Sequence, residues 1–371
     1  MNRVDFGDYP LPSLRPLELS AEGLRVLDQR RLPGEEAWLL LRTPEEVAGA
    51  IKEMAVRGAP AIGLAAAYGI FLAVREAEEG DWLSAAERAA EMLLATRPTA
   101  ANLRWAVERM YACARSLQGL SREEAAEALR EKALLLHRED EEMNRRLSRL
   151  GADLLPPRAR VLTHCNAGAL ATGGYGTALG ILRAAREQGK EVEVFVGETR
   201  PWLQGARLTA WELSREGFPV TVITDAAAGI LLQRRMVDLV LVGADRIAAS
   251  GDVVNKVGTY PLAVLASRHG LPFYVAAPWS TVDTELLSGG EASIEERGKE
   301  ELGYSLPPGV SAWNPVFDLT PAELVTAIIT DRGVAFPPFA TSLRFLTRAG
   351  ERGRDTFLAS ASTGGEGRGG T

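Results

Sequence analysis

Two residues with chemistry suited to catalysis each lie just beyond a short apolar run. Cys165 lies beyond the run at 160–162, and Asp245 lies beyond Leu239–Val242. A thiol ahead of a glycine-rich helix start can have a lowered pKa. A carboxyl in a partly apolar pocket can have a raised pKa and donate a proton. Residue type alone favours a buried, inert cysteine and an aspartate that caps a turn. Their positions make both residues candidates for catalysis.

The chain has two cysteines, and their sequence surroundings differ. Cys113 lies inside the helical pattern Arg109–Leu117, which predicts a core position. Two cysteines make neither a disulfide framework nor a Cys-rich zinc module. The three histidines are too far apart in sequence for metal-ligand spacing, so no metal site is expected. His164 adjoins Cys165, but neighbouring residues in a strand point to opposite faces, which disfavours His164 as the base.

Three basic residues could together bind one anion. Arg57 and Arg97 each lie at a break in a helical pattern, and Lys256 comes shortly before a glycine that opens a helix. Guanidinium and ammonium groups bind phosphate well, although exposed residues without a function are commoner. The glycines within 173–176 could bring backbone N–H groups to a phosphate, or could only allow tight turns. Their spacing matches neither the dinucleotide fingerprint nor the P-loop.

The second half of the chain alternates between short apolar runs and helical patterns. Runs rich in Val, Ile, Leu and Phe are typical of strands buried on both faces of a parallel sheet. Repeated strand–helix units predict an α/β fold with a doubly wound, Rossmann-like sheet. Because ligands bind beyond the carboxyl ends of such strands, Cys165 and Asp245 should share one rim. The predicted strands are 160–164, 193–196, 220–224, 239–242 and 273–276, and the predicted helices are 175–188, 203–216, 230–235 and 258–269.

The first half of the chain predicts a smaller, mainly helical domain over residues 1–150. It opens with short antiparallel strands at 17–19, 23–28 and 37–41. Helical patterning then continues to about residue 150, after a helix start in which Thr43 is the expected N-cap. After two prolines, the Rossmann-like catalytic domain should span 157–345. Residues 350–371 are rich in Gly, Ser and Thr and are predicted to be a disordered tail.

Composition excludes several classes of protein. The 371 residues carry 42 basic and 49 acidic side chains, a net charge of −7, which argues against a nucleic-acid coat. Hydrophobic residues make up 46% of the chain, which is typical of a globular protein. The amino terminus lacks the apolar run of a signal peptide. The most apolar stretch, 59–74, is short and contains glycines, so we expect no membrane span and a cytoplasmic protein.

Five longer motifs identify a family. They are Arg57-Gly58-Ala59-Pro60-Ala61-Ile62-Gly63, Thr163-His164-Cys165-Asn166-Ala167-Gly168, Gly197-Glu198-Thr199-Arg200-Pro201, Gly243-Ala244-Asp245-Arg246-Ile247 and Asn255-Lys256-Val257-Gly258-Thr259. In this order they resemble the motifs of the methylthioribose-1-phosphate isomerases of methionine salvage, and the likeness extends from about Leu17 to about Val334. The same superfamily contains ribose-1,5-bisphosphate isomerases and non-enzymatic regulatory subunits of a translation-initiation guanine-nucleotide exchange factor.

The resemblance implies an aldose–ketose isomerase that converts 5-methylthioribose 1-phosphate to 5-methylthioribulose 1-phosphate. It implies that Asp245 protonates the ring oxygen, and that Cys165 acts as a base or as a polarising group. Neither a metal nor a nicotinamide cofactor is implied, and the implied assembly is a homodimer. By similarity the substrate-binding residues are Arg57, Gly58, Ala59, Arg97, Gln204, Asn255 and Lys256.

Two alternatives stay open at this stage. One is an isomerase of a related phosphorylated pentose, such as 5-deoxyribose 1-phosphate or ribose 1,5-bisphosphate. It would differ in the pocket for the C5 substituent, which should be apolar for a thioether and basic for a second phosphate. The other is a regulatory subunit without turnover. The presence of both Cys165 and Asp245 favours an enzyme.

Overall fold

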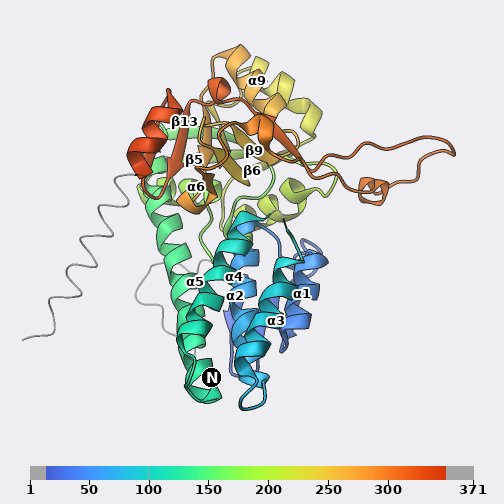
Figure 1. The fold of residues 1–371 in the computed structure, drawn as a ribbon. Helices are drawn as coiled ribbons and strands as arrows, with labels where there is room; N and C mark the ends of the chain where they lie inside the picture. Colours follow the sequence, from blue (N-terminus) through green and yellow to red (C-terminus); the bar gives the residue numbers. More distant parts are fainter. Residues whose placement is uncertain (1–13, 99, 348–371) are drawn as a thin grey trace, which may run out of the picture.

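A computed structural model describes residues 14–98 and 100–347. A helical half formed by the first part of the chain lies against a half built around a large sheet (Figure 1). The predicted tail at 350–371 lies outside the described residues. Helix α5 (Arg122–Ala152) extends from the helical half into the half built around the sheet (Figure 1). It has 31 residues and begins with a capping box at Ser121 and Glu124.

The helical half opens with the predicted antiparallel strands, confirmed as β1 (Leu17–Leu19), β2 (Leu24–Leu27) and β3 (Trp38–Leu41). The expected N-cap is also confirmed, because the Thr43 hydroxyl accepts a hydrogen bond from the Glu46 N–H at 3.3 Å. The helices that follow are α1 (Pro44–Lys52), α2 (Ala59–Glu76), α3 (Trp82–Leu94) and α4 (Ala101–Ser116).

Helix α2 is the centre of this half. It contacts α1, α3, α4 and α5, and its residues from Ala61 to Val74 are all buried. Among the described residues it alone is long and apolar enough to cross a membrane, which corrects our reading of 59–74 as too short. However, 78% of that window is buried inside the protein, as in the central helix of a globular core.

Within the described ranges the main sheet has seven strands in the order β14-β13-β10-β7-β4-β5-β6. All neighbours are parallel except β13 and β14. The order reverses between β4 and β7, which makes this a doubly wound sheet, as predicted. The strands are β4 (Arg158–Thr163), β5 (Glu191–Gly197), β6 (Val220–Ile223), β7 (Leu239–Val242), β10 (Phe273–Ala276), β13 (Ala327–Thr330) and β14 (Gly333–Ala335).

Helices cover both faces of this sheet, which explains the unbroken apolar runs. Alternate strand residues enter different cores: Val161 packs in the core that contains α6, whereas Leu162 packs in the core that contains α8 and α9. The predicted helices are confirmed with shifted ends. They are α6 (Ala178–Glu187), a π-helical turn (Gly205–Thr209) continuing into α7 (Ala210–Arg215), α8 (Ala228–Gln233) and α9 (Thr259–His269).

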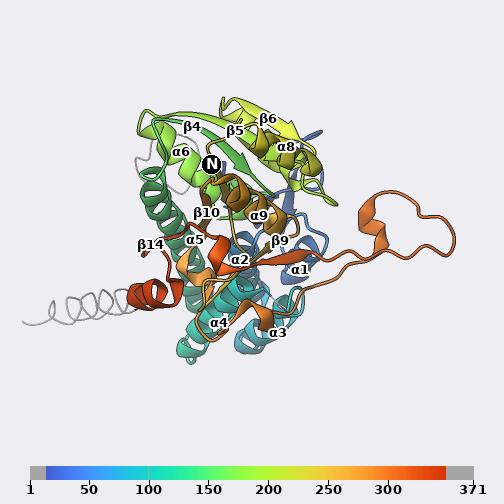
Figure 2. The same cartoon turned by 90° about the horizontal axis from the view of Figure 1, so that it is seen from above.

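A second sheet, which the sequence did not predict, adjoins the first. Its order is β11-β8-β9-β12, from strands of two to four residues. Its strands are β8 (Arg246–Ala248), β9 (Val253–Lys256), β11 (Val282–Asp283) and β12 (Phe317–Thr320). The segment between β11 and β12 leaves the body of the protein and returns (orange in Figures 1 and 2), and Trp313 within it is 77% exposed.

The hydrophobic cores divide inside α5 rather than between elements. Leu136 belongs to the core of the helical half, whereas Leu147 belongs to a core of the sheet half. A single rigid helix therefore contributes to both cores and ties the two halves together. The domain boundary predicted between residues 150 and 157 stays a prediction.

Candidate active site

The nine residues predicted for the site line one cavity at the carboxyl ends of β4 and β7, where the strand order reverses. The helical half supplies the turn before α2 and the connection between α3 and α4, and the sheet half supplies the rest. The nine lining residues are Arg57, Gly58, Ala59, Arg97, Cys165, Gln204, Asp245, Asn255 and Lys256. The structure thus brings together residues separated by up to 199 positions in sequence, since 256 − 57 = 199.

Cys165 has a left-handed backbone conformation, with φ of 60°, directly beyond β4. This region is unfavourable for a residue other than glycine and needs support from its surroundings. Two threonines provide it. The Cys165 N–H donates to Thr199 Oγ1 at 2.8 Å, and Thr209 Oγ1 donates to the Cys165 carbonyl at 2.6 Å. The backbone that carries the thiol is therefore held from both sides.

Asp245 occupies the turn directly after β7, where its N–H donates to the Val254 carbonyl at 3.0 Å. Burial raises the pKa of its carboxyl, and the nearby charges of Lys256, Arg97 and Arg57 lower it, with burial the larger cause. The net shift is upward, so the protonated form persists to a higher pH than in an ordinary aspartate. This is the property needed in a general acid.

The cavity also contains polar atoms without partners in the protein. Within the described ranges, the buried Arg57 Nε and Gln204 Oε1 have no hydrogen-bond partner. Burial lowers the pKa of Lys256, while the charges of Cys165 and Asp245 raise it, and the net shift is downward. Groups of this kind are costly to bury alone and are satisfied by a bound polar ligand. The cavity suits a ligand that combines an anion with hydroxyl groups.

Arg297 is a further lining residue that the sequence did not reveal. It belongs to the segment between β11 and β12, donates to Glu295 at 2.8 Å and to Glu301 at 2.9 Å, and contacts Met54 of the helical half at 3.3 Å. Glu295 also lies 3.8 Å from Arg97. No regular hydrophobic period marks this segment, so only the folded chain shows that Arg297 reaches the cavity.

His164 and the glycines at 173–176 play supporting parts. The His164 ring contacts the Val257 carbonyl at 2.9 Å and Thr199 Oγ1 at 3.5 Å, and burial lowers its pKa. The glycines do not line the cavity. A Cβ at Gly176 would lie 2.6 Å from backbone atoms of Gly168, so close packing explains this glycine. The structure thus favours the tight-turn reading over the phosphate loop.

Among residues 14–98 and 100–347, no group of three His, Cys, Asp or Glu side chains could hold a metal ion. The titratable side chains that line the cavity include Asp245, Cys165 and His164, together with the cations of Arg57, Arg97, Lys256 and Arg297. This arrangement can move protons between a bound sugar phosphate and the protein.

Comparisons with known proteins agree on the family. The profile of the initiation factor 2 subunit family matches residues 55–337. A methylthioribose-1-phosphate isomerase from Pelotomaculum thermopropionicum is 55% identical over 329 residues, covering 86% of this chain and 90% of the relative. The structure of 5-methylthioribose 1-phosphate isomerase from Pyrococcus horikoshii OT3 is 44% identical in sequence, with a TM-score of 0.86. The match covers 91% of this chain and 96% of that structure's chain. The structure of translation initiation factor eIF-2B, subunit delta, from A. fulgidus is 47% identical in sequence, with a TM-score of 0.83. The match covers 91% of this chain and 100% of that structure's chain.

Proposed function

The chain belongs to the initiation factor 2 subunit family, and we propose that it converts 5-methylthioribose 1-phosphate to 5-methylthioribulose 1-phosphate in methionine salvage. One observation carries the proposal. A carboxyl whose pKa is raised by burial and a thiol on a strained, supported turn line the same cavity, together with four cations. The two relatives named above as isomerases match this chain over 90% and 96% of their own lengths.

The reaction must first open a ring that cannot open by itself. The phosphate on the anomeric oxygen locks the sugar as a furanose, so an acid has to protonate the ring oxygen while its bond to C1 breaks. We assign this step to Asp245, whose protonated form is favoured by burial. The positive charge that develops at C1 is then next to a carboxylate, which stabilises it.

Hydrogen then moves from C2 to C1. In the proton route, Cys165 takes the C2 proton, an enol forms between C1 and C2, and Cys165 returns a proton to C1 after exchange with solvent. The C2 hydroxyl loses its proton to the Asp245 carboxylate, which completes the ketone and restores the acid. In the hydride route, hydrogen passes directly from C2 to C1, and Cys165 polarises the site. Product formed in deuterated water carries deuterium at C1 only by the proton route.

Substrate binding follows from the groups that line the cavity. Arg57, Arg97 and Lys256 supply positive charge for the phosphate. The turn at Gly58 and Ala59 begins the 18-residue helix α2, whose first N–H groups and dipole also favour an anion. The side-chain amides of Gln204 and Asn255 can donate to and accept from the sugar hydroxyls, and they complete the proposed substrate-binding residues.

The C5 substituent has a place next to Asp245. An adjoining cavity shares Gly58, Ala59, Arg97, Asp245 and Phe317 with the site. Its further lining is mainly apolar, from Ile62, Ala100, Ala101, Val254 and Ala292. Two carboxylates lie near its cations, since Glu295 lies 3.8 Å from Arg97 and Asp283 lies 3.9 Å from Arg246. A thioether fits such a surface, whereas a second phosphate would meet the Glu295 carboxylate.

A direct assay of the purified protein tests the proposal. We expect ketose formation from 5-methylthioribose 1-phosphate, with kcat/KM at least about tenfold above that for ribose 1,5-bisphosphate. Faster turnover of the bisphosphate or of 5-deoxyribose 1-phosphate would move the assignment to a related isomerase. The likeness to the A. fulgidus initiation factor subunit makes a regulatory protein the second candidate. No turnover of any of the three sugars would favour it.

We propose that the protein acts in the cytoplasm, that it forms a homodimer, and that residues 1–150 and 157–345 are its two domains. The cavity receives residues from both parts of the chain, which supports a site between domains. Size-exclusion chromatography with light scattering at micromolar concentration tests the dimer, and a monomeric mass would exclude it.

A further inference from the structure

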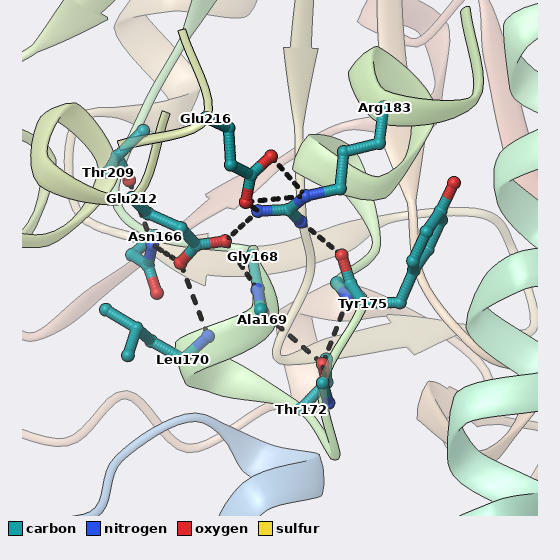
Figure 3. A network of polar contacts seen from close by, with 12 residues as sticks. Asn166, Gly168, Ala169, Leu170, Thr172, Tyr175, Arg183, Thr209, Glu212 and Glu216 are labelled. Carbon is teal, nitrogen blue, oxygen red and sulfur yellow. Dashed lines mark hydrogen bonds and ion pairs between the residues drawn. The ribbon is translucent and has the colours of Figure 1, made fainter. Parts of the chain in front are cut away.

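A buried network behind the cavity is centred on Glu212, in α7 (Figure 3). Its side chain has no exposed surface and accepts four hydrogen bonds. The donors are Arg183 Nη2 at 2.6 Å, the Ala169 N–H at 2.6 Å, the Leu170 N–H at 3.3 Å and Asn166 Nδ2 at 3.2 Å. Four donors directed at two oxygens leave Glu212 acting purely as an acceptor.

Arg183 balances the charge of Glu212 without drawing on the cations of the cavity. It lies in α6, and its Nε donates to Glu216 at 2.8 and 3.1 Å. Its Nη1 donates to the Tyr175 carbonyl. Of the four donors to Glu212, only the Asn166 amide belongs to a residue that lines the cavity, and neither Glu212 nor Arg183 lines it. The mechanism proposed above uses neither residue.

Glu212 determines which way the Asn166 side chain faces. Asn166 Nδ2 must point to the acceptors, Glu212 at 3.2 Å and Thr209 Oγ1 at 3.1 Å. Asn166 Oδ1 then faces the opposite way and accepts from Arg57 Nη2 at 2.6 Å, beside a second bond from Nη2 to the Asn166 carbonyl at 2.8 Å. A flipped amide would set an NH₂ group against the guanidinium, donor against donor.

We propose that Glu212 is a positioning residue that holds Arg57 in its phosphate-binding place through the Asn166 amide. The proposal rests on the proposed function, which assigns the phosphate to Arg57. Thr209 connects the same amide to the backbone of Cys165, since its hydroxyl accepts from Asn166 and donates to the Cys165 carbonyl. One buried carboxylate thus orders a cation and supports the turn that carries the thiol.

The first test compares two isosteric variants. Glu212→Gln replaces an acceptor with an amide that brings its own NH₂ group to the donors. We expect KM for the sugar phosphate to rise about tenfold or more, with a smaller fall in kcat. Glu216→Gln is the matched control, because Glu216 bonds the same Arg183 and has no contact with Asn166. Its KM should stay within about twofold of the starting protein.

A second test needs no turnover. In a Cys113→Ala background the remaining thiol is Cys165, and inorganic phosphate should protect it from iodoacetamide by occupying the neighbouring cations. The phosphate concentration for half protection should rise about tenfold in Glu212→Gln and stay unchanged in Glu216→Gln. Adding Glu212→Gln to Arg57→Ala should cause no further rise, because the effect passes through Arg57.

The outcomes separate the two proposals. Equal KM and equal protection in Glu212→Gln and Glu216→Gln would overturn the positioning role, as would full additivity with Arg57→Ala. A protein without isomerase turnover that still shows the shift in phosphate protection would retain the role of Glu212 and lose the proposed function. If Glu212→Gln does not fold, Asn166→Ala breaks the same link while leaving Glu212 three donors. Unchanged KM and protection in Asn166→Ala would contradict the proposal.

Discussion

The network behind β4 contains the fully buried Glu212 carboxyl, the cavity beyond β7 contains the half-buried Asp245 carboxyl, and the two have opposite hydrogen-bonding surroundings. Glu212 accepts four hydrogen bonds and pairs with Arg183 at 2.6 Å. Among the described residues no group donates a hydrogen bond to the Asp245 carboxyl, which interacts with the nearby cations by charge alone, and burial raises its pKa. A full set of donors holds the Glu212 carboxyl in one place, whereas burial without donors raises the pKa of Asp245, as the general acid that we propose requires.

The same contrast applies to the arginines of the two regions. Arg183 donates from Nε, Nη1 and Nη2, whereas the buried Arg57 Nε has no partner within the described part of the chain. An unsatisfied buried donor costs stability, so it is kept where a ligand will complete it. Rigidity behind the site allows the groups inside it to remain available for the substrate.

The largest expected effect comes from removing the reactive groups. Cys165→Ser and Asp245→Asn should each lower turnover about 10²- to 10⁴-fold, because each removes a proton-transfer group. Asp245→Asn should keep or raise the thermal midpoint. Burial raises the pKa of Asp245, so holding it ionised above its ordinary pKa destabilises the fold, and a neutral amide removes that cost. Turnover is measured as product formation, and the thermal midpoint is measured by calorimetry. Near-normal turnover in both variants would refute the catalytic assignment.

Breaking the satisfied network should affect stability first. Arg183→Gln leaves the fully buried Glu212 carboxylate without its charge partner, which should cost about 3–5 kcal/mol in the free energy of unfolding. Arg186→Gln is the control on the same helix and should cost about 1 kcal/mol. Among the described residues, the Arg186 guanidinium donates to the Glu216 carbonyl and lies over the Phe218 ring. Urea unfolding measures both. If both variants lose the same free energy of unfolding, the buried pair of Arg183 and Glu212 contributes no more stability than the exposed contacts of Arg186.

The pH dependence of turnover should sharpen the contrast between the carboxyls. Since the pKa of Asp245 is raised and its protonated form is the acid, kcat should fall about tenfold per pH unit above that raised pKa. Burial lowers the pKa of Lys256, so substrate affinity should be lost at a lower pH than for an exposed lysine. Profiles of kcat and kcat/KM measure the two separately. The residual activity of Asp245→Asn should not show this fall in kcat with rising pH. If the fall persists in that variant, Asp245 is not the acid responsible for it.

The smallest effect is expected at the other cysteine. Cys113 lies in α4, half-buried against the helical core, and burial raises the pKa of its thiol. Cys113→Ala should leave kcat and KM within about twofold and cost about 1 kcal/mol or less in stability, because little apolar surface is lost. A large fall in turnover would mean that the helical half shares in the chemistry through this thiol, contrary to the separation of the two cysteines.

Much of the fold could be predicted because its signals are local. The apolar runs of β7 and β10 match the observed strands residue for residue, and Thr43 caps α1 as its hydroxyl and the Pro44 that follows it predict. The second sheet was missed because its strands are short and pair over long separations. Phe317 lies opposite Lys256, and no pattern within either segment announces that partner.

The site divides in the same way. Cys165 and Asp245 were found because each directly follows a strand, and the ends of neighbouring parallel strands meet at one edge of a sheet. Arg297 and Thr209 were missed because their parts depend on which segments touch. A threonine that supports a cysteine 44 positions away looks like any other threonine in a helical pattern.

The sequence by itself determined the strand and helix pattern, the family, and which residue types could do the chemistry, because these depend on neighbours in the chain and on motifs. The tertiary structure alone decided which buried groups are satisfied. Glu212 lies in a helix and Asp245 follows a strand, and nothing in the sequence separates the two acids. Within the described ranges, however, Glu212 accepts from four donors and the Asp245 carboxyl from none. Hydrogen bonding and desolvation act through space, so only the folded chain could show that one carboxyl is fully hydrogen-bonded and that the pKa of the other is raised.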